Sequence, residues 1–130
     1  LSGACSGPSP MSQHQRLADY IDHMMDAARQ ACAYVNGLSR EDFMQDRRTQ
    51  QAVILNLVIL GEAATKLLAQ HEAFAGQHPQ VPWRSMKGMR NRIAHGYFDI
   101  NLAVVWDTVQ IALPELLAQL PAVRAAADGA

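Results

Sequence analysis

The segment from Met89 to Phe98 reads MRNRIAHGYF and holds side chains that can carry out acid–base chemistry on an anion. In this segment Arg90, His95 and Tyr97 have the spacing Arg-x-x-x-x-His-x-Tyr. The imidazole of a histidine ordinarily titrates near neutral pH, so it can take a proton from a ribose 2′-hydroxyl or give one to a leaving 5′-oxygen. A guanidinium can neutralise the charge that develops on a phosphate. The pattern is compatible with phosphodiester cleavage in RNA without a metal ion.

Spacing on a helix decides how Arg90 and His95 could cooperate. At about 100° per residue the two side chains lie about 140° apart, so they do not stack but can flank one small anion. Tyr97 would share the face of Arg90 only if the helix continued beyond Gly96. An ordinary surface histidine at the end of a helix gives the same spacing. The residues alone are therefore compatible both with a catalytic His95 and with an ordinary surface histidine at the end of a helix.

Positive charge is concentrated around this motif. The chain has 11 basic and 12 acidic residues and a net charge of −1, which excludes a protein coated in positive charge that binds any polyanion. Residues 83–98 contain no acidic side chain and these basic ones: Arg84, Lys87, Arg90 and Arg92. We expect Arg84, Lys87 and Arg92 to attract RNA by charge, although a solvated basic helix face would look the same.

Apolar spacing predicts the helices that must position the motif. A stripe at three- and four-residue intervals predicts an amphipathic helix over residues 12–36, capped by Ser12 and ended at Gly37. Residues 39–42 predict a short capped turn. Asp46 then caps a long helix over residues 47–70, which is apolar on most of its circumference and therefore central.

Two residues within that central helix have a special part in this interpretation. Gly61 lowers helix propensity by about 1 kcal/mol relative to Ala, a cost that close packing against another helix would explain. Glu62 either pairs with an arginine of the motif helix or faces solvent or an interface.

The second half of the chain predicts two further helices. Residues 71–81 form a connector with room for one helical turn, and Pro82 takes the first position of a helix over residues 83–95 that Gly96 ends. Asn101 caps the last helix, which Pro114 kinks. Trp83 and Trp106 are expected to be core anchors. With no alternating strand pattern, the fold class is all-α, an antiparallel bundle of four to five helices.

The length of 130 residues fits one domain. We expect residues 1–10 to be a flexible leader or a remnant of cloning that precedes a natural start at Met11. The helical domain then spans residues 11–120, and residues 121–130 form a flexible tail. The longest apolar run, residues 52–60, is shorter than the roughly 20 residues that cross a bilayer, so no membrane association is expected.

Cysteine and histidine usage predicts neither a disulfide framework nor a metal site. Cys5 and Cys32 are too few and too far apart, which is typical of reduced thiols in the cytoplasm. The remaining histidines lack the spacing of metal ligands: His14, His23, His71 and His78. We therefore expect no cofactor and a cytoplasmic protein.

The motif resembles that of the HEPN superfamily, specifically the HepT-like toxins. Three further segments resemble that family in the same order along the chain. They are GEAA at residues 61–64, HPQVPWR at residues 78–84, and WD at 106–107 with LP at 113–114. The resemblance covers roughly residues 11–120.

This resemblance implies a helical homodimer in which two Arg/His motifs face each other in an interface cleft. Such toxins are metal-independent endoribonucleases, and their antitoxin is a nucleotidyltransferase of the MNT type. By analogy Arg90 would bind the scissile phosphate, His95 would act as general acid or base, and Asn91 would orient either the phosphate or His95. Tyr97 would be the site of AMP modification, which blocks RNA by bulk and repulsion.

Two other functions are compatible with the same sequence. The surface of the motif could hold a nucleotide or dock a nucleotidyltransferase without catalysing any reaction. Alternatively, the chain could be a structural helical dimer without chemistry.

Overall fold

The structure, a computed structural model, describes residues 13–129 of the chain. This range is helical and contains no strand, which confirms the predicted all-α class. In chain order the elements are α1 (Gln13–Val35), α2 (Arg40–Gln45), α3 (Arg47–Gln70), α4 (Glu72–Gly76), α5 (Trp83–His95), the 3₁₀ turn η2 (Tyr97–Asp99), α6 (Leu102–Asp107), the π-helical turn η3 (Thr108–Ala112) and α7 (Leu113–Asp128).

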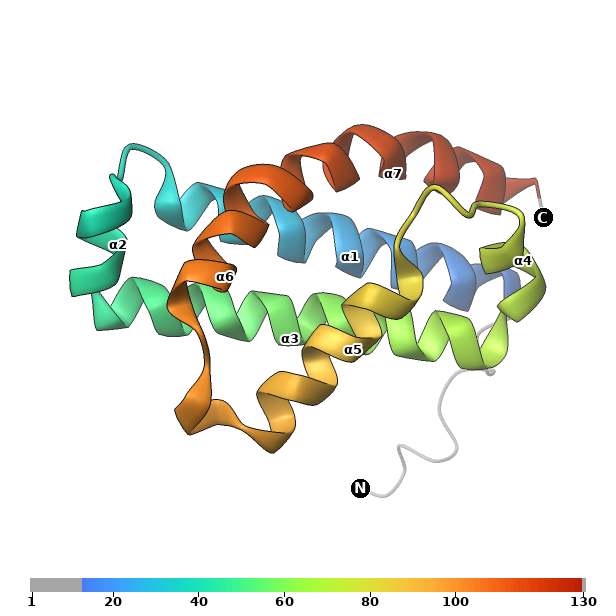
Figure 1. Cartoon of the computed structure of the whole chain (residues 1–130). Coiled ribbons are helices and arrows are strands. Elements are labelled where there is room, and N and C mark those ends of the chain that lie inside the picture. Colours follow the sequence, from blue (N-terminus) through green and yellow to red (C-terminus); the bar gives the residue numbers. More distant parts are fainter. Residues whose placement is uncertain (1–12, 130) are drawn as a thin grey trace, which may run out of the picture.

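Two antiparallel helices, α1 and α3, run side by side through the middle of the molecule (Figure 1). Helix α7 packs along α1, and α5 crosses α3 obliquely. Helices α6 and α7 follow each other through η3 without a break in helical structure, and the helix axis bends between them (Figure 1). The short helices α2 and α4 turn the chain at either end of α3.

Local capping residues begin and end these helices as the sequence predicts. Ser39 and Asp42 form a reciprocal capping box at α2. Asp46 caps α3, and hydrogen bonds from the Thr49 hydroxyl and backbone N–H lower the pKa of its carboxyl group. Gly37 has a φ of 82°, the left-handed conformation that ends α1. The predicted Ser12 cap lies outside the described residues.

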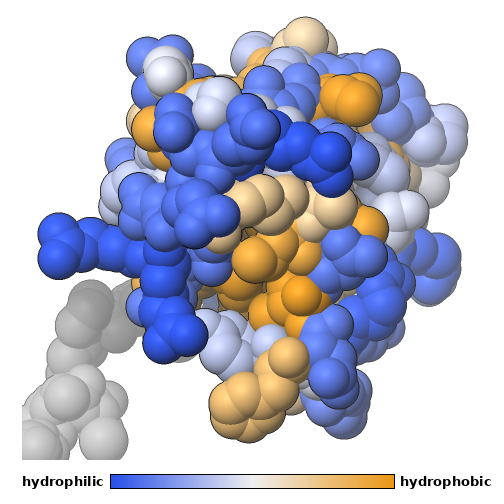
Figure 2. Space-filling model, turned by 60° about the vertical axis from the view of Figure 1, so that its left-hand side comes forward, coloured by the Kyte–Doolittle hydropathy of each residue, from blue (hydrophilic) through white to orange (hydrophobic). Residues whose placement is uncertain are grey.

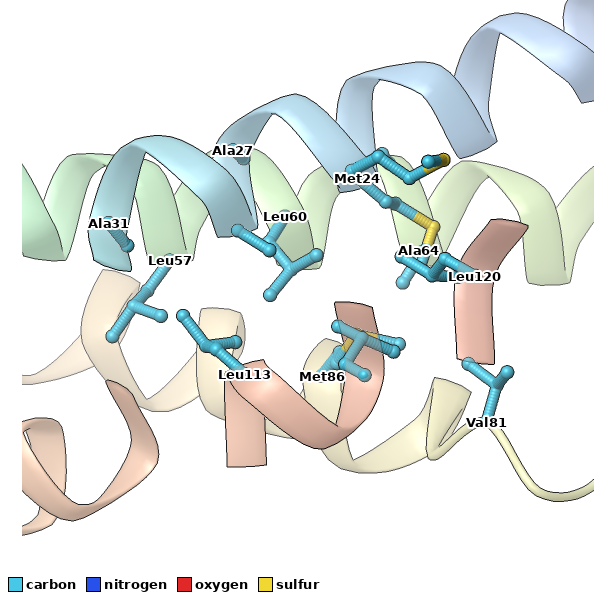
Figure 3. Close-up of a cluster of buried hydrophobic side chains, with 14 of the residues drawn as sticks. Met24, Ala27, Ala31, Leu57, Leu60, Ala64, Val81, Met86, Leu113 and Leu120 are labelled. Carbon is cyan, nitrogen blue, oxygen red and sulfur yellow. The ribbon is translucent and has the colours of Figure 1, made fainter. Parts of the chain in front are cut away.

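The long apolar faces of these helices meet in one core. Figure 3 shows Leu57 and Leu60 of α3 directed towards Leu113 and Leu120 of α7. Met86 contributes from α5. These side chains are 5% exposed or less, so the bundle is held by burial of apolar surface and not by buried charge.

The kink predicted at Pro114 takes the form of a π-helical turn, η3, just before the proline. An α-helical path would press the ring of Pro114 against the carbonyl of Gln110, and the wider π turn immediately before it avoids this clash. Proline has no N–H for the Val109 carbonyl, and the Cys32 thiol lies 3.8 Å from that oxygen as a donor. Burial raises the pKa of the Cys32 thiol. Cys5 lies outside the described residues.

Two boundary expectations are corrected by the structure. The predicted flexible tail, residues 121–130, is wrong, because α7 continues through Pro121 to Asp128. Val123 and Ala127 are fully buried, and Arg124 joins Asp22 of α1 at 2.8 Å, so tertiary contacts hold this segment. At α5, Pro82 is the residue before the first helical turn and not its first member. The expected leader, residues 1–10, lies outside the described residues.

By length and composition alone, α3 is apolar enough to cross a membrane, the one such helix among the described residues. Its apolar residues form no uninterrupted run, because Asn56 and Glu62 divide them. Leu57, Leu60, Ala64 and Leu67 of α3 are buried in the bundle, and the central helix of a bundle has this composition for that reason alone.

Gly61 sets the distance between α3 and α5. A Cβ at this position would overlap the Cβ of Arg90 and lie 2.7 Å from the Met86 carbonyl oxygen. The backbones of the two helices therefore approach as closely as glycine allows.

We predict that Gly61→Ala lowers the free energy of unfolding by about 1–3 kcal/mol, because the added methyl group forces α5 away from α3. Gly76→Ala is the matched control, since its Cβ would meet nothing within 4 Å and the change also falls in a helix. Urea unfolding of both variants measures the difference, and equal stability of the two would contradict the close packing.

A histidine at the turn between α3 and α4 makes stability depend on pH. The buried Nε2 of His71 has no hydrogen-bond partner among the described residues, and the ring packs edge-on against Tyr20. Desolvation, followed by the nearby charge of Arg16, lowers the pKa of His71. The folded state therefore binds this proton less readily than the unfolded state.

Linkage then gives the sign of the effect. Above the ordinary histidine pKa of about 6.5 both states are neutral, and as the pH falls below it the unfolded state is protonated first and stability is lost. We predict that His71→Phe, which keeps the ring contact but cannot titrate, reduces this loss. Urea unfolding between pH 7.5 and pH 5 on wild type, His71→Phe and the exposed control His23→Phe tests it. A parallel loss in all three would contradict the assignment.

Candidate active site

The motif helix α5 is fixed to the bundle by its apolar face. Trp83, Met86 and Ile93 are buried against the rest of the core. The indole N–H of Trp83 donates to the His78 carbonyl at 3.1 Å, which confirms that Trp83 is a core anchor. Trp106 is only partly buried and packs against the edge of the core, with its ring 5.4 Å from that of Phe43.

Arg90 lies on the same face of α5, one turn before the end of the buried stripe. Its Nη2 donates to the Thr65 hydroxyl at 3.1 Å, and its Nε lies 3.6 Å from Oε1 of Glu62. The side chain of Arg90 is 25% exposed. Of the alternatives left open for Glu62, the structure shows pairing with the motif arginine. The guanidinium is therefore held in a defined position by α3 and still reaches solvent.

His95 occupies the last turn of α5 and is exposed. Asn91, one turn earlier, is partly exposed. Gly96 ends the helix with a φ of −142° and a ψ of 49°, outside the helical region, and this turns the chain away from the helix axis. The expected change of direction after His95 is thus confirmed.

Tyr97 lies beyond this turn, in η2, and is 45% exposed. It lines a shallow hollow of about 380 Å³ together with Arg47, Gln50 and Ile54 of α3. Its ring packs edge-on against Phe98. Because the helix does not continue, Tyr97 does not share the face of Arg90.

Arg92 is exposed beside a second hollow, of about 220 Å³, between α5 and α6. Its walls are mainly apolar, with Asp99 and Asn101 among the polar lining residues. Three of the predicted site residues therefore lie in different surroundings: Arg90 against α3, Arg92 beside the hollow next to α6, and Tyr97 in η2.

The positive charge of α5 is partly matched by neighbouring carboxylates. Arg84 lies 3.7 Å from Glu72 of α4, in a fully solvated pair that contributes little to stability. Lys87 is partly buried on the helix surface. With Arg90 beside Glu62 as well, the net positive charge at this surface is smaller than the formal charge of four on α5.

Apolar side chains are exposed near the motif. Phe98 is 98% exposed and Val104 is 56% exposed, while Leu55 on α3 is 58% exposed. Figure 2 shows apolar surface, in orange and cream, on the end of the molecule that carries α2, α6 and η2, bordered by hydrophilic side chains. Such exposure in a small domain indicates an interaction surface.

The sequence did not single out Thr65. Its position three residues after Glu62 and four after Gly61 places all three on one side of α3, where the motif helix crosses. This spacing is the feature of the sequence from which a contact between Thr65 and the motif helix could be inferred. Among the described residues no group of three or more His, Cys, Asp or Glu side chains could hold a metal ion.

Comparison with known proteins agrees with this geometry. The family model described as Ribonuclease HepT-like matches residues 24–123. The probable ribonuclease HepT of Thermococcus cleftensis is 34% identical over 106 residues, which cover 82% of this chain and 94% of that protein. No solved structure matches.

Two further relatives carry provisional RNase names. One, from Caldanaerobacter subterraneus, is 34% identical over 101 residues, covering 78% of this chain and 88% of the relative. The other, from Methanocaldococcus jannaschii, is 37% identical over 93 residues, covering 72% and 71%. The chain belongs to the HepT-like ribonuclease family of the HEPN superfamily.

Proposed function

We propose that this protein is a metal-independent endoribonuclease and the toxin of a HepT/MNT toxin–antitoxin pair in the cytoplasm. The observation that supports this most is the arrangement at the end of α5. A guanidinium is held in place by α3, and an exposed imidazole follows on the last turn of the same helix. Membership of a ribonuclease family points the same way.

In this proposal His95 removes the proton from a ribose 2′-hydroxyl, and the 2′-oxygen attacks the adjacent phosphorus. The bond from phosphorus to the 5′-oxygen breaks, and the leaving oxygen takes a proton from an imidazolium, supplied by His95 of the partner subunit. Arg90 stabilises the charge on the pentavalent phosphate, and Asn91 orients phosphate or imidazole. The products are a 2′,3′-cyclic phosphate and a free 5′-hydroxyl.

The reaction requires a homodimer that brings two motifs together. Exposed Leu55, Ile59 and Phe98 supply apolar surface that a second copy would cover. Arg84, Lys87 and Arg92 from both copies would then draw RNA towards the paired helices.

Tyr97 is the proposed site of AMP addition by an MNT-type nucleotidyltransferase. Its exposed hydroxyl can attack the α-phosphorus of ATP, forming a phosphodiester and releasing pyrophosphate. The added nucleotide brings bulk and negative charge to the RNA-binding surface.

We predict that the purified protein cleaves RNA in excess EDTA and that His95→Ala lowers kcat by about 10²-fold or more, because proton transfer is lost. His23→Ala, another exposed histidine, is the matched control and keeps full activity. Product analysis by gel and mass spectrometry should show 2′,3′-cyclic phosphate ends. Cleavage that needs a divalent metal, or that survives His95→Ala, would contradict the mechanism. A complete lack of cleavage with intact binding to a nucleotidyltransferase would identify a non-catalytic module.

A second prediction concerns Tyr97. Incubation with an MNT-type nucleotidyltransferase, ATP and Mg²⁺ should add AMP to the wild type and remove its RNase activity, because the new charge repels RNA. Tyr97→Phe should stay unmodified, whereas Tyr34→Phe, which removes a hydroxyl from a side chain of similar exposure (47%), should be modified like the wild type. Intact-mass measurement checks this, and AMP on Tyr97→Phe would contradict it.

A further inference from the structure

Arg90 is engaged by a set of α3 residues before any RNA arrives. Gly61 lets the Arg90 side chain leave α5 directly against the α3 backbone, where a Cβ would overlap it. Thr65 accepts a hydrogen bond from Nη2 at 3.1 Å, and Glu62 places a carboxylate oxygen 3.6 Å from Nε. All three contacts come from two adjacent turns of one helix.

The hydrogen bonds of Thr65 and Arg90 determine how the two side chains interact. The Thr65 hydroxyl donates its only proton to the Gly61 carbonyl at 2.7 Å, so it faces Arg90 as an acceptor alone. This contact sets the plane of the guanidinium. The Nε–H of Arg90 is buried and has no hydrogen-bond partner among the described residues, because Glu62 stands just beyond bonding distance.

Glu62 therefore balances the charge of Arg90 without a hydrogen bond, and the Arg90 side chain as a whole is still 25% exposed. Glu62 is 49% exposed at its side chain, so its hold on Arg90 is weakened by water. A phosphate oxygen offers the guanidinium a charge-assisted hydrogen bond that Glu62 does not make at 3.6 Å.

We propose that Thr65 and Glu62 are positioning residues that act through Arg90, which rests on the proposed RNA cleavage. Thr65 fixes the orientation of the guanidinium for the charge of the transition state. Glu62 is an internal counter-ion that balances Arg90 in the free protein and gives way to the RNA phosphate.

The two residues then have opposite kinetic signatures. Thr65→Val keeps the charge of Arg90 but loses its orientation, so kcat falls by about tenfold while KM changes less than twofold. Thr65→Ser keeps the acceptor and restores kcat. Glu62→Gln removes the competing carboxylate, so RNA binds about threefold more tightly, the effect of one half-exposed charge pair.

The experiment measures steady-state cleavage of a short RNA, together with binding of its 2′-O-methyl form, which cannot be cleaved. Asp22→Asn is the control for Glu62→Gln, because it removes a carboxylate from an arginine pair on the α1–α7 side of the bundle. Each variant is also made with Arg90→Ala. Residues that act through Arg90 lose their effect in that background.

The outcomes separate this inference from the proposed function. Tighter binding by Glu62→Gln that disappears with Arg90→Ala, and a kcat loss restored by Thr65→Ser, support the positioning role. Cleavage with wild-type parameters in Thr65→Val and Glu62→Gln overturns it and leaves the ribonuclease intact. If the wild type binds RNA without cleaving it, the proposed function fails. Tighter binding of the 2′-O-methyl RNA by Glu62→Gln would then still support the counter-ion role of Glu62. A protein that neither binds nor cleaves RNA overturns both.

Discussion

The contact between α3 and α5 at Gly61 is the constraint on which the candidate site depends. Without a side chain at this position, the motif helix packs directly onto the backbone of the central helix. Arg90 then leaves α5 within reach of Glu62 and Thr65, which stand on the turns next to Gly61. A larger separation would leave the guanidinium in bulk solvent. Helix packing and electrostatic preorganisation are thus set by the same glycine.

Close packing also changes the charge that the motif helix presents at the surface. The basic residues of α5 and the acidic residues of α3 and α4 are brought together by the crossing, as the pairs Arg90–Glu62 and Arg84–Glu72 illustrate. Formal charge added along the chain overestimates the field of α5, because this partial neutralisation appears only after folding. The remaining positive potential is local to the surface of the motif helix.

Much of the fold can be read from the sequence, because its determinants are local. Ser39, Asp46 and Asn101 cap helices through hydrogen bonds to residues two or three positions away, and the stripe of α1 follows from helical periodicity. The prediction of a flexible tail failed although Val123 and Ala127 continue the three- and four-residue spacing of the buried Leu116 and Leu120 beyond Pro121. The burial of this segment depends on α1, about a hundred residues earlier, as the Arg124–Asp22 pair shows.

The candidate site can also be predicted from the sequence only in part. The spacing of Arg90, His95 and Tyr97 is visible in the sequence, and so is the end of the helix at Gly96. The role of Thr65 cannot be read from the sequence, because a threonine on a helix is common. Its contact with Arg90 forms only where the two helices cross. Local pattern therefore identifies the residues that could do chemistry, whereas tertiary packing determines which groups hold them in place.

The π turn before Pro114 acts on the last helical rod as an insertion of one residue would. Such a turn rotates everything that follows by about 100° relative to a regular helix. The first half of the rod can therefore direct Trp106 towards Phe43 of α2, while the second half directs Leu116 and Leu120 into the main core. One wide turn thus changes which side chains a continuous helix directs towards its neighbours.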